Sequence, residues 1–123
     1  MATTQVRTTT LTGRSTGLVQ VEDYQAPAYA ATIAITTGVN VGYTLVNVGQ
    51  LTGALAFNIL ATNPLIGDLV QCMFSADGTN RVVTFGANIK SAGTLTVLAN
   101  KYGTASFIFD GTNWIETGRV LTA

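Results

Sequence analysis

The chain of 123 residues contains no histidine, and this absence excludes several kinds of chemistry at once. Hydrolases that use a Ser-His-Asp or Cys-His site need an imidazole base, and most zinc sites use at least one imidazole ligand. The single cysteine, Cys72, excludes an intramolecular disulfide, and its apolar neighbours indicate a small buried side chain. We therefore expect neither a nucleophilic enzyme of these classes nor a zinc centre.

Charge is also scarce, because only 10% of the residues are charged, whereas soluble domains usually carry about 25%. The shortfall is uneven, since no Lys, Arg, Asp or Glu occurs from Tyr24 to Gly67. Proteins with so few charges tend to associate. We expect part of the surface to be covered in the working state by copies of the chain or by another protein. The alternative is a small protein kept in solution by Thr, Asn and Gly.

The charges that are present balance, with six basic and six acidic residues. A net charge near zero argues against nucleic acid or an anionic membrane as the main partner, because both attract a basic surface. The first 14 residues lack the apolar core of a signal peptide. No apolar run approaches the length of about 18 residues expected of a membrane-spanning helix. We expect no membrane partner.

Most of the chain consists of short apolar or alternating runs separated by turn residues, which is typical of β-strands. Residues 1–14 are rich in threonine and predict an extended arm, with a frayed terminus as the alternative, and 15–23 predict an edge strand. We therefore divide the chain into an arm with its edge strand, 1–27, and a β-domain, 28–123. Further strands are predicted at 29–37, 39–48, 54–61, 68–75, 81–85, 94–99, 104–110 and 113–119, with a connection at 24–28 and a loop at 86–93. Alternation predicts shared faces for three groups of residues: Leu55, Phe57 and Ile59; Val70, Cys72 and Phe74; and Ala105, Phe107 and Phe109, which face inward.

The tetrapeptide Asp-Gly-Thr-Asn occurs twice, at 77–80 and 110–113. Asp-Gly is a strong hairpin signal, because glycine adopts positive φ freely and aspartate tolerates it. The first copy predicts that 81–85 pairs antiparallel with 68–75, and the second predicts a hairpin that ends near residue 119. The sequences around the two copies do not align, so the repeat indicates a recurring turn and is no evidence of a solenoid, which needs at least three units.

Eight or nine short strands at a spacing of roughly ten residues predict an all-β fold. We expect an antiparallel β-sandwich, jelly-roll-like, with an extended N-terminal arm. A small barrel is the alternative architecture. No stretch shows a helical period over ten residues, although 54–61 is rich in the helix formers Ala and Leu.

Candidate chemistry is limited to carboxylates and aromatic rings. Asp68 and Glu116 are conceivable as a glycosidase pair, but nothing else supports an enzyme. The two Asp-Gly turns lack the spacing of an EF-hand loop, and no Gly-Lys-Ser/Thr phosphate loop is present, so we expect no metal and no cofactor. The candidates for a sugar-stacking platform are the aromatic residues Trp114, Tyr102, Tyr24, Tyr29 and Tyr43. We favour a Trp114 that closes the core, with its indole N–H bonded to a loop carbonyl.

Residues 51–119 resemble a module of tailed-bacteriophage virion proteins: a strand, a D-G turn, V-T-F-G, a G-T-L-T-V strand, then D-G-x-x-W and a final arginine. The matching positions are Gly67-Asp68, Asp77-Gly78, Val83-Thr84-Phe85-Gly86, Gly93-Thr94-Leu95, Asp110-Gly111, Trp114 and Arg119. The resemblance implies a β-sandwich that assembles as a trimer, and it transfers no catalytic residue. Such domains occur on capsid decoration proteins, head fibres and tail fibres.

We therefore expect a capsid decoration (cement) protein on the head surface, with further copies of itself and the major capsid protein as partners. The alternative is the tip domain of a fibre or spike that binds host-surface glycans. The arm and the uncharged first half are the predicted contact regions. The candidate interface residues are Arg7, Leu11, Arg14, Val19, Val21, Tyr29, Ile33, Ile35 and Tyr43.

Overall fold

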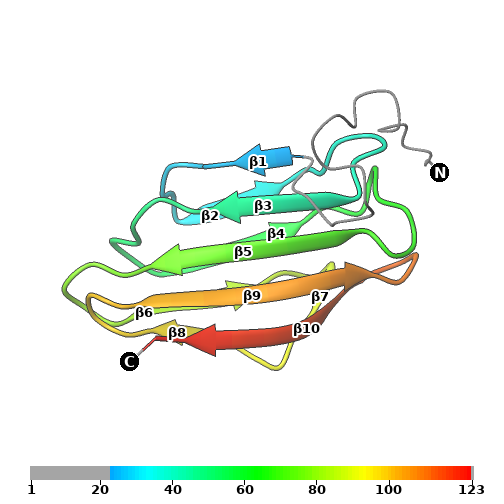
Figure 1. Ribbon diagram of the computed structural model, residues 1–123. Helices are drawn as coiled ribbons and strands as arrows, with labels where there is room; N and C mark the ends of the chain where they lie inside the picture. The colour runs from blue at the N-terminus through cyan, green and yellow to red at the C-terminus, as the bar shows by residue number, and fades with distance from the viewer. Residues whose placement is uncertain (1–22, 123) are drawn as a thin grey trace, which may run out of the picture.

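Two β-sheets packed face to face make up the molecule (Figure 1), whose computed structural model describes residues 23–122. Sheet A faces the viewer and has the order β1 (Asp23–Gln25), β3 (Tyr43–Asn47), β5 (Leu69–Ser75), β9 (Tyr102–Phe109), β10 (Trp114–Leu121) and β7 (Ile89–Lys90). Sheet B lies behind it and has the order β2 (Thr32–Ile35), β4 (Leu55–Ile59), β6 (Arg81–Phe85) and β8 (Leu95–Val97). Within 23–122 there is no helix, and so none that would cross a membrane.

The first six strands form a coil, because the chain alternates between the two sheets from β1 to β6. Each strand pairs in parallel with the strand one turn of the coil later, so that Thr44 lies opposite Val70 in sheet A and Thr32 lies opposite Ala56 in sheet B. The pairs β1–β3 and β4–β6 continue the same pattern. This is the stacking of a β-solenoid, in which each turn buries its apolar side chains against its neighbours.

The last strands close the coil with antiparallel pairing. β9 pairs with β5 and then turns back into β10, while β8 pairs with β6 in sheet B. The short β7 lies parallel to β10 at the far edge of sheet A. The ladder between β9 and β10 shifts register between Glu116 and Gly118, where Thr117 is the extra residue of a β-bulge.

The core lies between the sheets and follows from the alternation of apolar residues along each strand. Aromatic rings fill its centre, with the Phe57 and Phe74 centroids 5.5 Å apart and edge to face. At one end the Phe109 and Trp114 centroids lie 5.1 Å apart. The fully buried large side chains are Trp114, Phe57, Phe74, Phe107, Leu51, Leu55, Ile59, Leu95, Val46, Val70, Val83 and Val97.

The prediction of an all-β chain is confirmed, and so are the buried faces of most strands, such as Leu55, Phe57 and Ile59 on β4. The prediction of antiparallel sheets holds only for the C-terminal pairs. The sequence carried no evidence of a solenoid, because the coil repeats its backbone path without repeating its sequence. Period-two alternation marks a strand but carries no information about the direction of its partner.

The first Asp-Gly-Thr-Asn turn does not form the predicted hairpin. β5 belongs to sheet A and β6 to sheet B, so this turn carries the chain across the core from one sheet to the other. The second copy does join antiparallel neighbours, β9 and β10, as predicted. β1 begins at the last residue of the predicted edge strand and otherwise lies in the predicted connection 24–28, and β7 lies in the predicted loop 86–93. Almost all of the predicted edge strand, 15–23, lies outside the described residues.

Candidate functional site

The two ends of the sheets differ in charge. β1 and β2 are the first strands of sheets A and B, at the same end of the molecule (Figure 1). We call this the uncharged end. In the described strands β1 to β4 and in the connections between them, Asp23 is the only charged residue. The Gln25 amide donates to the Thr36 carbonyl at 3.0 Å and to Asp23 Oδ2 at 2.9 Å, which ties β1 to the chain that follows β2.

β1 and β2 are edge strands: in the described part of the chain, each pairs with another strand on one side only. The uncharged end therefore has two open strand edges. The side chains of β2 that point away from the core, Thr32 and Ala34, are small and exposed. Open edges of this kind are usually protected by lysine, proline, a bulge or a covering segment. β2 has none of the first three, so its edge is suited to pairing with another segment.

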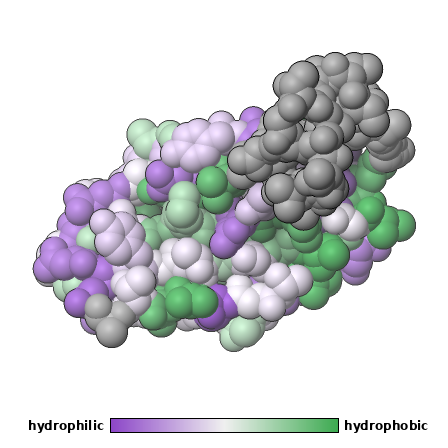
Figure 2. Space-filling model, viewed as in Figure 1, coloured by the Kyte–Doolittle hydropathy of each residue, from purple (hydrophilic) through white to green (hydrophobic). Residues whose placement is uncertain are grey.

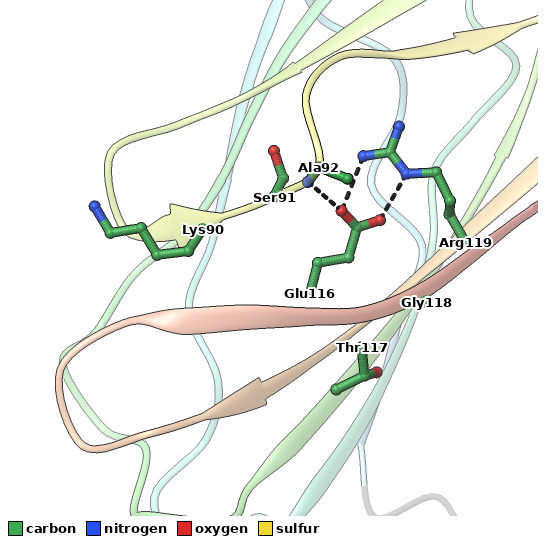
Figure 3. Close-up of a pocket in the computed structure, with 7 residues that line it drawn as sticks. All are labelled: Lys90, Ser91, Ala92, Glu116, Thr117, Gly118 and Arg119. Atoms are coloured by element: carbon green, nitrogen blue, oxygen red, sulfur yellow. Dashed lines mark hydrogen bonds and ion pairs between the residues drawn. The ribbon is translucent and has the colours of Figure 1, made fainter.

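The opposite end is closed by an ion pair that we call the clasp, formed by Glu116 and Arg119 (Figure 3). Arg119 Nε lies 2.8 Å from Glu116 Oε2, and Arg119 Nη2 lies 2.9 Å from Glu116 Oε1. The same guanidinium donates to the carbonyls of Gly93 and Thr94 at 2.9 and 2.8 Å. Glu116 Oε1 also accepts from the Ala92 amide at 2.8 Å. The clasp therefore fastens β10 to the segment that leads into β8.

A cavity of about 380 Å³ beside the clasp is the one drawn in Figure 3. Its carboxylate is fully engaged, because both oxygens of Glu116 accept hydrogen bonds, from Arg119 and from the Ala92 amide. The Arg119 guanidinium holds the pKa of Glu116 below its ordinary value. A carboxylate in this state is a poor proton donor. Asp68 is the other carboxylate of the glycosidase pair considered from the sequence. It lies in the turn before β5, where its Oδ2 accepts a hydrogen bond from the Leu65 amide at 2.9 Å.

The outer face of sheet A is the other candidate surface, and we define it by the outward side chains of β3, β5 and β9. Their register produces rows across the sheet: Tyr43, Leu69 and Ile108, then Leu45, Gln71 and Ser106, then Asn47, Met73 and Thr104. None of these residues is charged. Figure 2 shows this face, with pale and green residues over much of its centre and purple ones towards the left end.

A shallow cavity of about 250 Å³ lies on the outer face of sheet A, between its first and second rows. Tyr43 and Gln71 border it, and the Tyr43 hydroxyl donates to Gln71 Oε1 at 2.8 Å. Ser106 of β9 and Thr117 of the β10 bulge complete its polar lining. We did not identify Gln71, Ser106 or Thr117 from the sequence, because a neutral polar residue in a strand carries no signal of its own.

The predicted interface residues are dispersed. Ile33 and Ile35 point into the core, with 8% and 3% of their surface exposed, and therefore belong to the interior rather than the surface of the chain. Tyr29 is half-buried, and its hydroxyl donates to the Ala54 carbonyl at 2.8 Å. Tyr43 lies on the outer face of sheet A. The remaining predictions, Arg7, Leu11, Arg14, Val19 and Val21, lie outside the described residues.

The favoured interpretation of Trp114 is confirmed, because the side chain is fully buried and its indole N–H donates to the Leu60 carbonyl at 3.2 Å. Tyr102 is 61% exposed at the far end of the outer face of sheet A. The two rings therefore do not form one stacking platform. Among residues 23–122, no group of three or more His, Cys, Asp or Glu side chains is placed to hold a metal ion.

Searches of protein-family models and of curated proteins return no match to this chain.

Proposed function

We propose that this chain is an assembly protein of a bacteriophage particle, and specifically a decoration (cement) protein that binds the outer surface of the capsid. The observation that carries the proposal is the uncharged end. Two open edges, on β1 and β2, lie where the described first four strands carry one charge. The resemblance of residues 51–119 to virion modules supplies the biological setting.

Edge pairing is the proposed mode of attachment. A strand edge binds another strand through backbone hydrogen bonds, so affinity does not require charged side chains. A partner segment that pairs with β2 would extend sheet B, and the small side chains of Thr32 and Ala34 leave room for its approach. We propose that neighbouring copies in a homotrimer and the major capsid protein are the partners.

Binding of this kind would stabilise the shell by mass action. A protein that binds only the assembled shell lowers the free energy of that state by an amount that grows with its concentration. The clasp is consistent with this role. It fixes the closing strands at the other end of the molecule, so the strands of the uncharged end are left available for binding.

A fibre or spike tip that binds host-surface glycans is the second candidate. It was predicted to use Trp114 and Tyr102, but the burial of Trp114 removes the larger ring from that role. Tyr102 remains as an exposed ring.

The direct test is to add the purified protein to capsid shells that lack it and to measure the temperature at which the shells break down. We expect a higher temperature, together with density on the head surface in electron microscopy. A variant without residues 1–14 tests the predicted arm and should lose attachment. Unchanged shell stability, or density on the tail alone, would contradict the proposal.

A further inference from the structure

The cavity on the outer face of sheet A combines an aromatic ring with neutral hydrogen-bonding groups. Its mouth lies between β3, β5 and β9. Thr117, the extra residue of the bulge in β10, lies on the opposite side of the strand from Glu116 (Figure 3), as successive residues of a strand do. Thr117 takes no part in the ion pair of the clasp, and it borders this cavity as well as the one beside the clasp. Bulges are common next to functional sites.

The ring of Tyr43 is held in place by the hydrogen bond from its hydroxyl to Gln71 Oε1, at 2.8 Å. This bond leaves both hydrogens of the Gln71 amide nitrogen available as donors and the Tyr43 oxygen available as an acceptor. The hydroxyls of Ser106 and Thr117 make no hydrogen bond to any residue from 23 to 122. The cavity therefore offers several donors and acceptors that the fold does not use.

The apolar part of the lining includes Leu69, which is 36% exposed, and the half-buried ring of Tyr43. Small-molecule sites typically have such a composition, with apolar walls and a few polar groups that fix orientation. The volume of about 250 Å³ lies just below the range of roughly 300–1,000 Å³ for drug-sized ligands. A single ring with its substituents is the size of ligand that fits.

We infer that this cavity binds one uncharged sugar ring, held by Tyr43 and by the neutral polar groups of Gln71, Ser106 and Thr117. A pyranose has hydroxyls for these groups and an apolar C–H face for the aromatic ring. None of the lining residues is charged, so an anionic ligand would find no counter-ion there. The inference does not depend on capsid binding, because the cavity lies on the outer face of sheet A between β3, β5 and β9, and not at the open edges of β1 and β2.

The test is a titration of the full-length protein, labelled with ¹⁵N, with the methyl glycosides of glucose and galactose and with N-acetylglucosamine. A site this small and neutral should bind with a dissociation constant on the order of millimolar. The amide signals that shift should be those around Tyr43, Gln71, Ser106 and Thr117. Shifts confined to the surroundings of Tyr102, or no shift with any of these sugars, would overturn the inference.

Variants give the matched comparison. Gln71→Leu keeps the size of the side chain and removes its donors, so the affinity should fall by about tenfold, the value of one hydrogen bond. Tyr43→Phe keeps the ring and removes the hydroxyl, with a smaller loss. Thr84→Ala, on the exposed outer side of β6 in sheet B, is the control and should bind as the unaltered chain does.

Two further measurements keep the result decisive. Thermal unfolding of each variant shows whether a loss of binding reflects a loss of fold. Titration with sialic acid and with inorganic phosphate tests the neutrality of the ligand. Tighter binding of either anion than of the neutral sugars would contradict the proposed class of ligand, and equal binding by Gln71→Leu and the unaltered chain would contradict the proposed site.

Discussion

The parallel coil of β1–β6 and the strands that follow it build the same two-layer core by different means. The coil is held by backbone ladders and apolar packing, and from Tyr24 to Gly67 it contains no charged residue. β8, β9 and β10 use antiparallel pairing, the short β7 lies parallel to β10, and the clasp fastens β10 to the segment between β7 and β8. β7 and β8 are the edge strands at the other end, but they have only two and three residues, and the clasp ties the segment between them to β10. This difference makes the uncharged end the place where we expect growth or docking.

The two Asp-Gly-Thr-Asn copies show the same contrast on a smaller scale. At the second copy, the turn closes on itself: the Asp110 amide donates to the Asn113 carbonyl, and Asp110 Oδ1 accepts from the amides of Thr112 and Asn113. At the first copy, the Asp77 amide donates to the Leu51 carbonyl, and the Asp77 carbonyl accepts from the Asn100 amide. One tetrapeptide thus forms a hairpin or an arch, according to where its backbone partners lie.

The largest effect on the free energy of unfolding is expected at Trp114, where the parallel coil and the strands that follow it are joined. Trp114 of β10 packs in the core and donates to the Leu60 carbonyl, just after β4 of the coil. Trp114→Ala should lower the free energy of unfolding by about 3–5 kcal/mol, because it leaves a large cavity. Trp114→Phe should cost less. Urea unfolding measures both, and a loss below about 1 kcal/mol for the alanine variant would mean that the two parts are stable independently.

The clasp should have the next largest effect on the free energy of unfolding. Arg119→Ala should cost about 1–2 kcal/mol, because it leaves the nearly buried Glu116 carboxylate and two carbonyls without their donor. Arg81→Ala is the matched control, since Arg81 forms a similar ion pair with Asp77 on the surface of the first turn. Exposed pairs contribute little. Equal losses in thermal unfolding would show that the clasp has no special role.

The glycines of the two turns should respond differently to substitution. Gly111 has a φ of 104°, which side chains rarely adopt, and a Cβ there would lie 3.2 Å from Ile66 Cγ1. Gly111→Ala should therefore cost about 1–2 kcal/mol. Gly78 has no positive φ and open space around its Cα, so Gly78→Ala should change stability by less than about 0.5 kcal/mol. The reverse order would refute the contrast between hairpin and arch.

The smallest expected effect is the loss of stability at acidic pH. Arg81 lowers the pKa of Asp77, the amides of Asn113 and Thr112 lower that of Asp110, and Arg119 lowers that of Glu116. Their contribution is complete at pH values above the ordinary range near 4 and is lost as the pH falls through the lowered values. Urea midpoints should fall below pH 4, and Glu116→Gln should weaken this dependence. A midpoint that stays constant to pH 2 would contradict it.

The sequence predicted the strands and their buried faces well, because alternation alone determines both. Val70, Cys72 and Phe74 on β5 and Ala105, Phe107 and Phe109 on β9 face the core as expected. It did not predict the coil, because Asp77-Gly78 has the same local signal as Asp110-Gly111 and the difference lies in the distant carbonyl of Leu51. Of the lining of the proposed sugar site, only Tyr43 was a candidate from the sequence. Gln71, Ser106 and Thr117 could not be identified, since their grouping depends on the register of three strands and on the bulge at Thr117.

The mass of the protein in native solution tests the central claim, that the uncharged end is the docking surface, most directly. The unaltered chain should form a defined oligomer at micromolar concentration. Thr32→Lys combined with Ala34→Lys places two charges along the open edge of β2 and should give a monomer. The control, Thr84→Lys on β6, lies between two paired strands and should leave the mass unchanged. An unaltered chain that is monomeric, or an oligomer that survives the two lysines, would contradict the account.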